Sequence, residues 1–315
     1  MSYECKEHQL NKAEEFFDLF LGDNIFGPKS VFDVSERDLS RYIFRGQSDS
    51  SFSLIPSAHR KGVDFNGFTP QPLRSSSEKP EEKLALHLHA EFRSITLFLE
   101  AADSAGLPTP LDYNALKEHD PIFDRYNLRD YSPLEKDFPD RKYLPSMAMA
   151  QHYGVPTRLL DWTESPFIAA YFAALSVSKI GSKSKEVEDG ARISVTCLSR
   201  HLIDEVDGLE YVSAPRAGNP FLCAQKGAFT LIKNANPYFL SNGEWPSVEA
   251  SIKESDVPQT LAKYPLIKVT LPCSEADELL RLLYRLGISR LTLMPSYESA
   301  ASSLAYKEAL WSKGG

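Results

Sequence analysis

The feature that most constrains this chain is the stretch over residues 148–175, in which apolar residues enclose a few charged and polar ones. It predicts a helix over 143–153, a short extended segment over 157–162 and a second helix over 167–175. Ser165 stands at the expected N-cap of the second helix, directly before a proline at its first position. The second helix is apolar on nearly every side, which is typical of a buried helix. Polar residues carried into such a core need partners.

The rest of the chain mixes strands and helices without a regular βαβ rhythm. We expect a helix at the N-terminus, a long amphipathic helix over 81–105 and an exposed loop over 62–80. Four further segments have the composition of strands: 41–44, 192–198, 221–232 and 266–271. This pattern favours an α+β fold, in which a mixed, largely antiparallel sheet is flanked by helices.

The order of these elements suggests three parts. Residues 1–37 form an N-terminal helix and connection, and residues 38–240 form the core domain. Residues 241–315 are expected to add a strand-helix-strand-helix extension that packs on the core. In this extension Ser274 is expected to cap the first helix and Gly287 to end it.

Charge and cysteine usage narrow the class of protein. Asp and Glu number 43 against 35 Lys and Arg, so the formal net charge is -8, which argues against general nucleic-acid binding. The four cysteines are scattered and form neither a metal-binding pair nor a disulfide framework, which favours a reducing cytoplasm. No apolar run approaches the roughly 18 residues of a membrane span, so we expect no membrane contact.

Several common catalytic motifs are absent from the sequence. It contains no GxGxxG after a strand, no P-loop, no GxSxG, no HExxH and no paired CxxC. His87 and His89 lie two residues apart on a predicted helix and therefore face different sides, so we expect no metal site there. An enzyme whose catalytic residues are dispersed along the chain remains possible.

Three short segments combine polar residues with glycine and aromatic residues: YIFRGQ at 42–47, QHYGVPTRLLDWT at 151–163 and AQKGAF at 224–229. Together they resemble the FRG domain family, whose Phe-Arg-Gly motif is Phe44-Arg45-Gly46 here. The SSFSLIPSAHR sequence that follows the first segment also fits. The resemblance covers roughly residues 38–232.

The order of these segments is also similar to that of ADP-ribosyltransferases of the Arg-Ser-Glu type. By this resemblance Arg45 is the first-strand arginine that supports NAD, and Asp161-Trp162-Thr163 stand where the second motif does. The resemblance implies NAD as substrate and an ADP-ribosyltransferase or NAD glycohydrolase, such as a toxin or phage-defence effector. The acceptor, a protein or a nucleic acid, and the oligomeric state are left open.

A site for NAD can be assigned from these residues. A guanidinium binds pyrophosphate or ribose through two parallel hydrogen bonds, a glycine allows close backbone approach, and Trp162 or Tyr153 could stack on the nicotinamide. The candidate catalytic residues are Arg45, Asp161 and Gln225. The candidate cofactor-binding residues are Gly46, Gln47, Gln151, His152, Tyr153, Arg158, Trp162 and Thr163.

The third motif departs from the transferase pattern. Those enzymes carry a Glu on a later strand, whereas this chain has Gln225, and Glu244 and Glu298 lie outside any matching motif. Three explanations stay open. The chemistry differs, Asp161 is the carboxylate, or the chain binds a nucleotide without cleaving it.

Each candidate residue also has a purely structural interpretation. Arg45 and Asp161 could form a buried ion pair, and Arg158 could pair with Asp161 or a backbone carbonyl. His152 could cap a helix C-terminus, and Thr163 could cap the next helix. Trp162 could simply belong to the core, as could Tyr153.

These interpretations lead to different functions. The alternative to an enzyme is a non-catalytic module that binds a nucleotide, a nucleic acid or a protein, or a scaffold. A deep cleft that joins Arg45, Asp161 and Gln225 would favour the enzyme.

Overall fold

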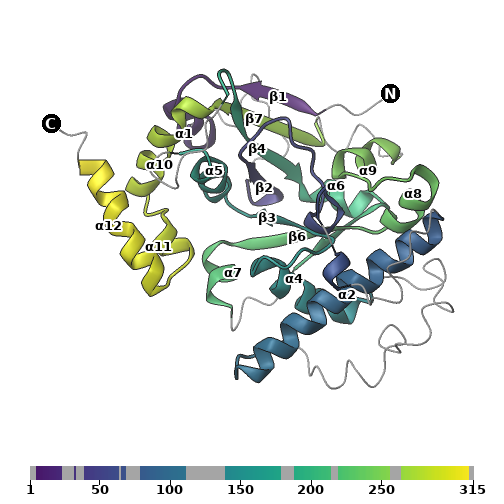
Figure 1. The fold of residues 1–315 in the computed structure, drawn as a ribbon. Coiled ribbons are helices and arrows are strands. Elements are labelled where there is room, and N and C mark those ends of the chain that lie inside the picture. The colour runs from purple at the N-terminus through teal and green to yellow at the C-terminus, as the bar shows by residue number, and fades with distance from the viewer. Residues whose placement is uncertain are drawn as a thin grey trace.

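The centre of the fold is a seven-stranded sheet with the order β1-β7-β4-β2-β3-β6-β5 (Figure 1). The computed structural model describes residues 5–22, 32, 39–63, 65–68, 79–110, 139–178, 188–213, 219–255 and 264–311. The strands are β1 Lys6–Gln9, β2 Tyr42–Gln47, β3 Leu159–Thr163, β4 Arg192–Ser199, β5 Leu209–Val212, β6 Gly227–Ile232 and β7 Leu266–Pro272. β1 and β7 are parallel and the other neighbours are antiparallel, which confirms the predicted mixed, largely antiparallel sheet.

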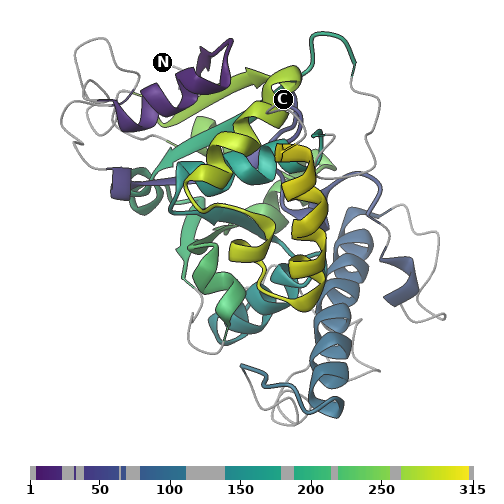
Figure 2. The same ribbon diagram turned by 90° about the vertical axis from the view of Figure 1, so that its left-hand side faces the viewer.

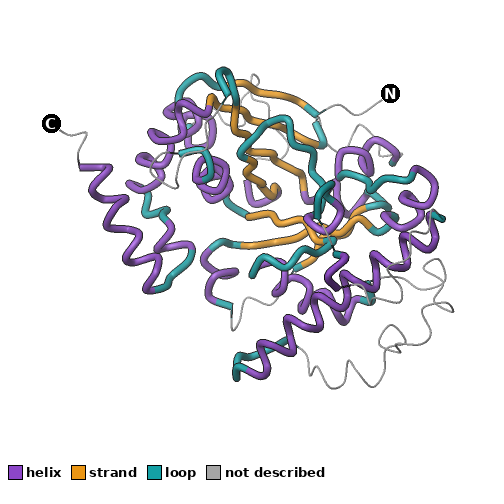
Figure 3. Tube along the Cα trace, in the orientation of Figure 1, coloured by secondary structure: helices purple, strands orange, loops and turns teal. Residues whose placement is uncertain are grey.

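Helices cover both faces of this sheet (Figure 3). They are α1 Ala13–Leu21, α2 Pro80–Ser104, α4 Leu144–His152, α5 Pro166–Leu175, α6 Arg200–Glu205, α7 Pro220–Ala224, α8 Ala235–Asn242, α9 Val248–Glu254, α10 Ala276–Arg285, α11 Arg290–Leu293 and α12 Tyr297–Trp311. One apolar cluster joins α1, α5 and α10 to β2, β4 and β7, and a second joins α2 and α4 to β3 and β6. A third cluster, with α6, α8 and α9, covers the opposite face.

The alternation of side chains along β3 explains these clusters. Leu159 belongs to the α2 and α4 cluster, whereas Leu160 and Trp162 belong to the cluster beneath α6 and α9. The long helix α2 runs along the lower part of the molecule, and its end projects beyond the rest (Figures 1 and 2). Among the residues described, no helix is both long enough and apolar enough to cross a bilayer.

Most of the strongly patterned segments form the elements predicted for them. These are α2, α4, β3, α5, β4 and β7. The predicted loop over 62–80 falls partly outside the described residues, while 66–68 form a short 3-10 turn beside the buried Phe65.

Five local predictions were wrong. The N-terminal segment starts with β1 before α1, and β2 continues through Gln47 because it pairs with β4 along its full length. Residues 220–224 form α7, whose first turn holds Pro220 and whose start is capped by Asn219, so the strand begins only at Gly227. A 3-10 turn over Cys273–Glu275 replaces the predicted Ser274 cap. Residues 290–293 form a helical turn capped by Ser289 instead of a strand.

Strands from all three predicted parts of the chain pair in the one sheet. β1 comes from the N-terminal part and pairs with β7, which comes from the C-terminal part. β7 in turn pairs with β4 of the core part. The three parts therefore contribute strands to the same sheet. The boundaries at residues 37 and 240 stay a prediction.

The crossing of α5 over β2 explains a glycine. A Cβ atom on Gly46 would lie 1.9 Å from the carbonyl oxygen of Ala169 and 2.8 Å from the amide nitrogen of Ala173. Only glycine allows the helix backbone to approach the strand so closely. Ala169, Ala170 and Ala173 keep the helix surface small at this crossing.

Candidate functional site

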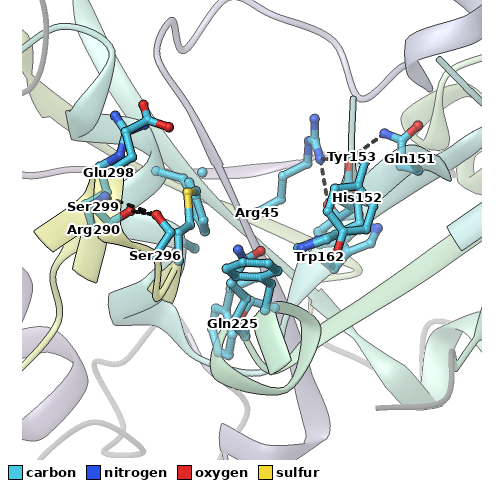
Figure 4. A pocket seen from close by; sticks show the side chains of 18 residues that line it. Arg45, Gln151, His152, Tyr153, Trp162, Gln225, Arg290, Ser296, Glu298 and Ser299 are labelled. Atoms are coloured by element: carbon cyan, nitrogen blue, oxygen red, sulfur yellow. Dashed lines mark hydrogen bonds and ion pairs between the residues drawn. The ribbon is translucent and has the colours of Figure 1, made fainter. Parts of the chain in front are cut away.

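A pocket of about 510 Å³ opens where β2 and β3 separate. These two strands pair at a single register position, Phe44 with Thr163. The lining residues come from β2, from the stretch between α4 and α5, and from the C-terminal third of the chain: Phe44, Arg45, Gly46, Gln151, His152, Tyr153, Asp161, Trp162, Thr163, Ala169, Phe172, Phe221, Gln225, Arg290, Met294, Ser296, Glu298 and Ser299. In Figure 4 Arg45 and Gln151 lie on one side, Glu298 lies on the opposite side, and Gln225 lies between them.

Arg45 spans the gap between the two strands. Its Nη1 donates to the backbone oxygen of Asp161 at 2.6 Å and lies 3.7 Å from Asp161 Oδ2. Its Nε is buried, and no described residue accepts a hydrogen bond from it. Burial lowers the pKa of the guanidinium, and the nearby Asp161 carboxylate partly offsets that effect. The predicted pairing with Asp161 is therefore present, and Arg45 also lines the pocket.

Asp161 presents a carboxylate to the pocket. Its side chain is 46% exposed, and Oδ2 accepts a hydrogen bond from Gln151 Nε2 at 2.7 Å. Within the described part of the chain, Oδ1 accepts no hydrogen bond. One oxygen is thus fixed by the protein, and the other can accept a hydrogen bond from a ligand.

Gln151 orients this carboxylate because its own amide is held firmly. Its Oε1 accepts hydrogen bonds from Ser57 Oγ at 2.8 Å, Thr157 N at 3.1 Å and Thr157 Oγ1 at 2.9 Å. The amide oxygen is therefore fully used, which leaves Nε2 pointing at Asp161. Ser57 belongs to the SSFSLIPSAHR sequence, so that segment supports the pocket from behind.

Aromatic rings line one side of the pocket at the end of α4. The imidazole of His152 stacks on Phe221 with ring centres 5.9 Å apart, and Tyr153 is 51% exposed and stacks on Phe98. Burial lowers the pKa of His152, and the nearby Asp161 carboxylate acts in the opposite direction. The side of the pocket is therefore apolar enough to hold a planar ring.

Trp162 and Thr163 have mainly structural contacts. The Trp162 indole is 4% exposed and donates to Thr230 Oγ1 at 2.9 Å, which places the ring in the core. Thr163 Oγ1 donates to the backbone oxygen of Gln225 at 2.7 Å and accepts from Ser165 N at 3.2 Å. Ser165 is the N-cap residue of α5, as predicted, although its side chain makes no capping hydrogen bond.

Gln225 links the pocket to the C-terminal segment. Its Nε2 donates to the backbone oxygen of Leu293 at 3.3 Å. It follows α7 and precedes Lys226, whose φ of 48° makes the turn into β6. Gln225 therefore lines the pocket beside the C-terminal helices that close it.

Two predicted site residues lie outside the pocket lining. Gln47 is buried, and its Nε2 donates to the backbone oxygen of Phe52 at 3.1 Å. Arg158 pairs with Glu91 at 2.7 Å, and both side chains are fully buried. The ion pair that we predicted between Arg158 and Asp161 is not formed. Asp161 lies on the pocket side, whereas Glu91 on α2 reaches the guanidinium.

The far wall of the pocket was not predicted. It is formed by α11, α12 and the residues between them: Arg290, Met294, Ser296, Glu298 and Ser299. Arg290 and Glu298 form an exposed ion pair at 3.5 Å, and Glu298 is 82% exposed. Glu298 is one of the two carboxylates that lie outside any motif, so its place in the pocket could not be predicted from the sequence.

Residues 113–180 match the family model named FRG domain. The chain contains an FRG domain. The described part of the match, 139–178, contains α4 with Gln151 and β3 with Asp161. It also contains α5, the helix that crosses β2 at Gly46. No curated protein and no solved structure matches the chain.

The FRG motif can now be interpreted residue by residue. Phe44-Arg45-Gly46 precedes the matched segment in sequence, but β2 lies between β4 and β3 in the sheet. Phe44 packs in the core, Arg45 enters the pocket and Gly46 admits α5. The motif therefore contributes both to the packing of the core and to the lining of the pocket, which we call the FRG pocket.

Proposed function

We propose that the FRG pocket binds NAD and that the domain is an ADP-ribosyltransferase-like enzyme, which transfers ADP-ribose to an acceptor or to water. The observation that carries this proposal is that Arg45, Asp161 and Gln225, separated by up to 180 positions in the sequence, line one pocket of about 510 Å³. Pockets of this size hold small organic ligands and cofactors.

The chemical character of the pocket suits a dinucleotide. Arg45 and Arg290 offer guanidinium groups for the pyrophosphate, and Ser296 and Ser299 offer hydroxyl groups. Asp161 offers a free carboxylate oxygen for a ribose hydroxyl. His152 and Phe221 offer ring faces for a base or the nicotinamide.

The proposed reaction breaks the bond between C1′ of the ribose and the nicotinamide nitrogen. Nicotinamide leaves with the bonding electrons as a neutral molecule, and an oxygen or nitrogen of the acceptor bonds to C1′ and loses its proton to a carboxylate or to water. Asp161, fixed by Gln151, supports the positive charge that develops on the ribose. Arg45 holds the substrate in place.

A first experiment measures thermal stabilisation by NAD. Because a ligand that binds only the folded state raises stability, NAD at 100 times its Kd should add about 2.7 kcal/mol to the wild type. Arg45→Ala should remain folded and lose this stabilisation, whereas Arg141→Ala, a control at a side chain that is 81% exposed, should keep it. A folded wild type that gains no stability, or an Arg45→Ala variant with normal affinity, would contradict the proposal.

A second experiment separates binding from catalysis. The release of nicotinamide is followed with the wild type and with Asp161→Asn, which keeps the shape of the side chain. Release by the wild type that falls at least about tenfold in the variant supports the enzyme.

A non-catalytic nucleotide-binding module is the second candidate. The observation in its favour is that the residue in place of the expected Glu, Gln225, is uncharged and tied to Leu293 by its amide. Stabilisation by NAD without release of nicotinamide would select this function.

A further inference from the structure

A cluster of three potential metal ligands lies outside the pocket, where α2 meets the 3-10 turn Ser57–His59. It consists of His59, His87 and Glu91, whose donor atoms all lie within 4.8 Å of one another. His87 and Glu91 are four residues apart on α2 and so share one face of the helix. His59 reaches the same point from a segment distant in the sequence.

Three of the four ring nitrogens of His59 and His87 are buried and have no hydrogen-bond partner among the described residues. His59 is 5% exposed, and neither of its ring nitrogens has a hydrogen-bond partner among the described residues. The same holds for Nε2 of His87. The ring of His59 is held by parallel stacking on Trp245, with centres 3.9 Å apart. A buried polar atom without a hydrogen-bond partner costs free energy. The unpaired imidazole nitrogens near the Glu91 carboxylate therefore indicate a missing ligand.

Glu91 has room for an ion despite its salt bridge. Its two oxygens accept hydrogen bonds from three N–H groups of Arg158. The backbone N donates to Oε1 at 2.8 Å and Nη2 donates to Oε2 at 2.7 Å. Nε lies between the two oxygens, 3.2 Å from Oε1 and 3.0 Å from Oε2. A carboxylate offers about four lone-pair positions, and Nε is shared between both oxygens, so a position for an ion opens when Nε bonds only one of them. A ligating carboxylate that is also hydrogen-bonded by a neighbour is normal around protein-bound metals.

We propose that His59, His87 and Glu91 bind one divalent transition-metal ion, such as Zn²⁺. Two imidazoles and a carboxylate are a ligand set that Zn²⁺ uses, with water as the fourth ligand. Bonds of about 2.1 Å in a tetrahedral site place ligands about 3.4 Å apart, so the three donors draw together by roughly an ångström. The ion joins the 3-10 turn to α2, and Ser57 in that turn holds Gln151, which orients Asp161.

The test uses the folded chain after treatment with a chelator and titration with Zn²⁺, read by calorimetry and by bound metal per chain. The substitutions are His87→Phe and His59→Phe, which keep a ring for stacking. The matched control is His89→Phe. His89 is also buried and lies on the same helix, neither of its ring nitrogens has a hydrogen-bond partner in the described part of the chain, and it does not belong to the cluster.

We expect one ion per wild-type chain, an unchanged affinity in His89→Phe and a loss in His87→Phe that exceeds the roughly 10- to 100-fold effect of losing an outer partner. If neither cluster variant folds, cobalt(II) on the wild type provides the answer. The absorption spectrum of the cobalt(II) protein should show nitrogen and oxygen ligands and no thiolate charge-transfer band. Such a band would mean that the ion binds instead to an exposed cysteine, Cys5 or Cys223. No binding by the folded wild type, an equal effect of all three variants, or a thiolate signal would overturn the proposal.

Discussion

Arg45 and Gly46 are adjacent on β2 and serve different purposes. Arg45 places a guanidinium in the lining of the pocket, whereas Gly46 is required by packing. The prediction that Gly46 lets a ligand approach was made from the residue type alone. The structure adds a cause within the fold, because the backbone of α5 occupies the space where a Cβ would lie.

Gly46→Ala should therefore destabilise the fold. The new methyl group meets the backbone of α5 at 1.9 Å, and a helix backbone cannot move aside as a side chain can. We expect a loss of about 3 kcal/mol or more in the free energy of unfolding, measured by urea denaturation. Gly67→Ala, at a glycine with no atom within 4 Å of the added carbon, should change it by no more than about 0.5 kcal/mol. Equal stabilities of the two variants would refute this account of the crossing.

At the scale of elements, the buried Arg158 joins α2, β3 and α8. Its guanidinium bonds Glu91 on α2 and donates to Asn236 Oδ1 on α8 at 3.1 Å, while its backbone leads into β3. The Glu91 carboxylate also accepts a hydrogen bond from the backbone amide of Arg158, so it holds both the backbone and the side chain of this residue. The start of the strand that carries Asp161 is thereby held against the long helix.

Arg158→Met should cost about 3–5 kcal/mol, because it leaves the Glu91 carboxylate buried without its charged partner. The double variant with Glu91→Met should recover part of this loss, since apolar side chains of similar volume can replace a buried pair. Arg141→Met removes an exposed ion pair with Glu210 and should cost no more than about 1 kcal/mol. Equilibrium unfolding of all four proteins tests the prediction, which fails if Arg158→Met is as mild as Arg141→Met.

At the scale of the molecule, the pocket is complete only when distant parts of the chain meet. β2 and the α4–α5 stretch form one side, and α11 and α12 form the other (Figure 4). The second side brings Glu298, which among the described lining residues is the one carboxylate besides Asp161. On the proposed function, it faces the substrate from the opposite wall.

Glu298→Gln should lower the release of nicotinamide from NAD at least about tenfold while leaving the melting temperature unchanged, since the side chain is 82% exposed. The matched control is Glu244→Gln, at an exposed glutamate outside the pocket lining, which should release nicotinamide at the wild-type rate. Full activity of Glu298→Gln would show that α12 only encloses the pocket.

Elements with strong local patterns could be predicted from the sequence. The apolar periodicity of α2, the apolar α5 after its proline and the alternation in β4 identified these elements. Short or polar elements could not be predicted. The strand Lys6–Gln9 has no apolar alternation and exists because β7 offers a parallel partner, and Arg290–Leu293 depends on a local cap.

The resemblance to the FRG domain family and the mixed sheet could be predicted from local sequence patterns, and nine of the eleven candidate site residues line the pocket. The partners of the charged and ligating side chains came from the packing of distant segments. Arg158 was expected to pair with its sequence neighbour Asp161 and pairs with Glu91, 67 positions away. Only His89 was considered as a second imidazole for a metal site with His87, whereas in the structure the imidazole close to His87 is that of His59. The physical reason is that periodicity fixes which face of an element is buried, while ion pairs, ligand sets and pocket walls depend on distances that arise only when elements pack together.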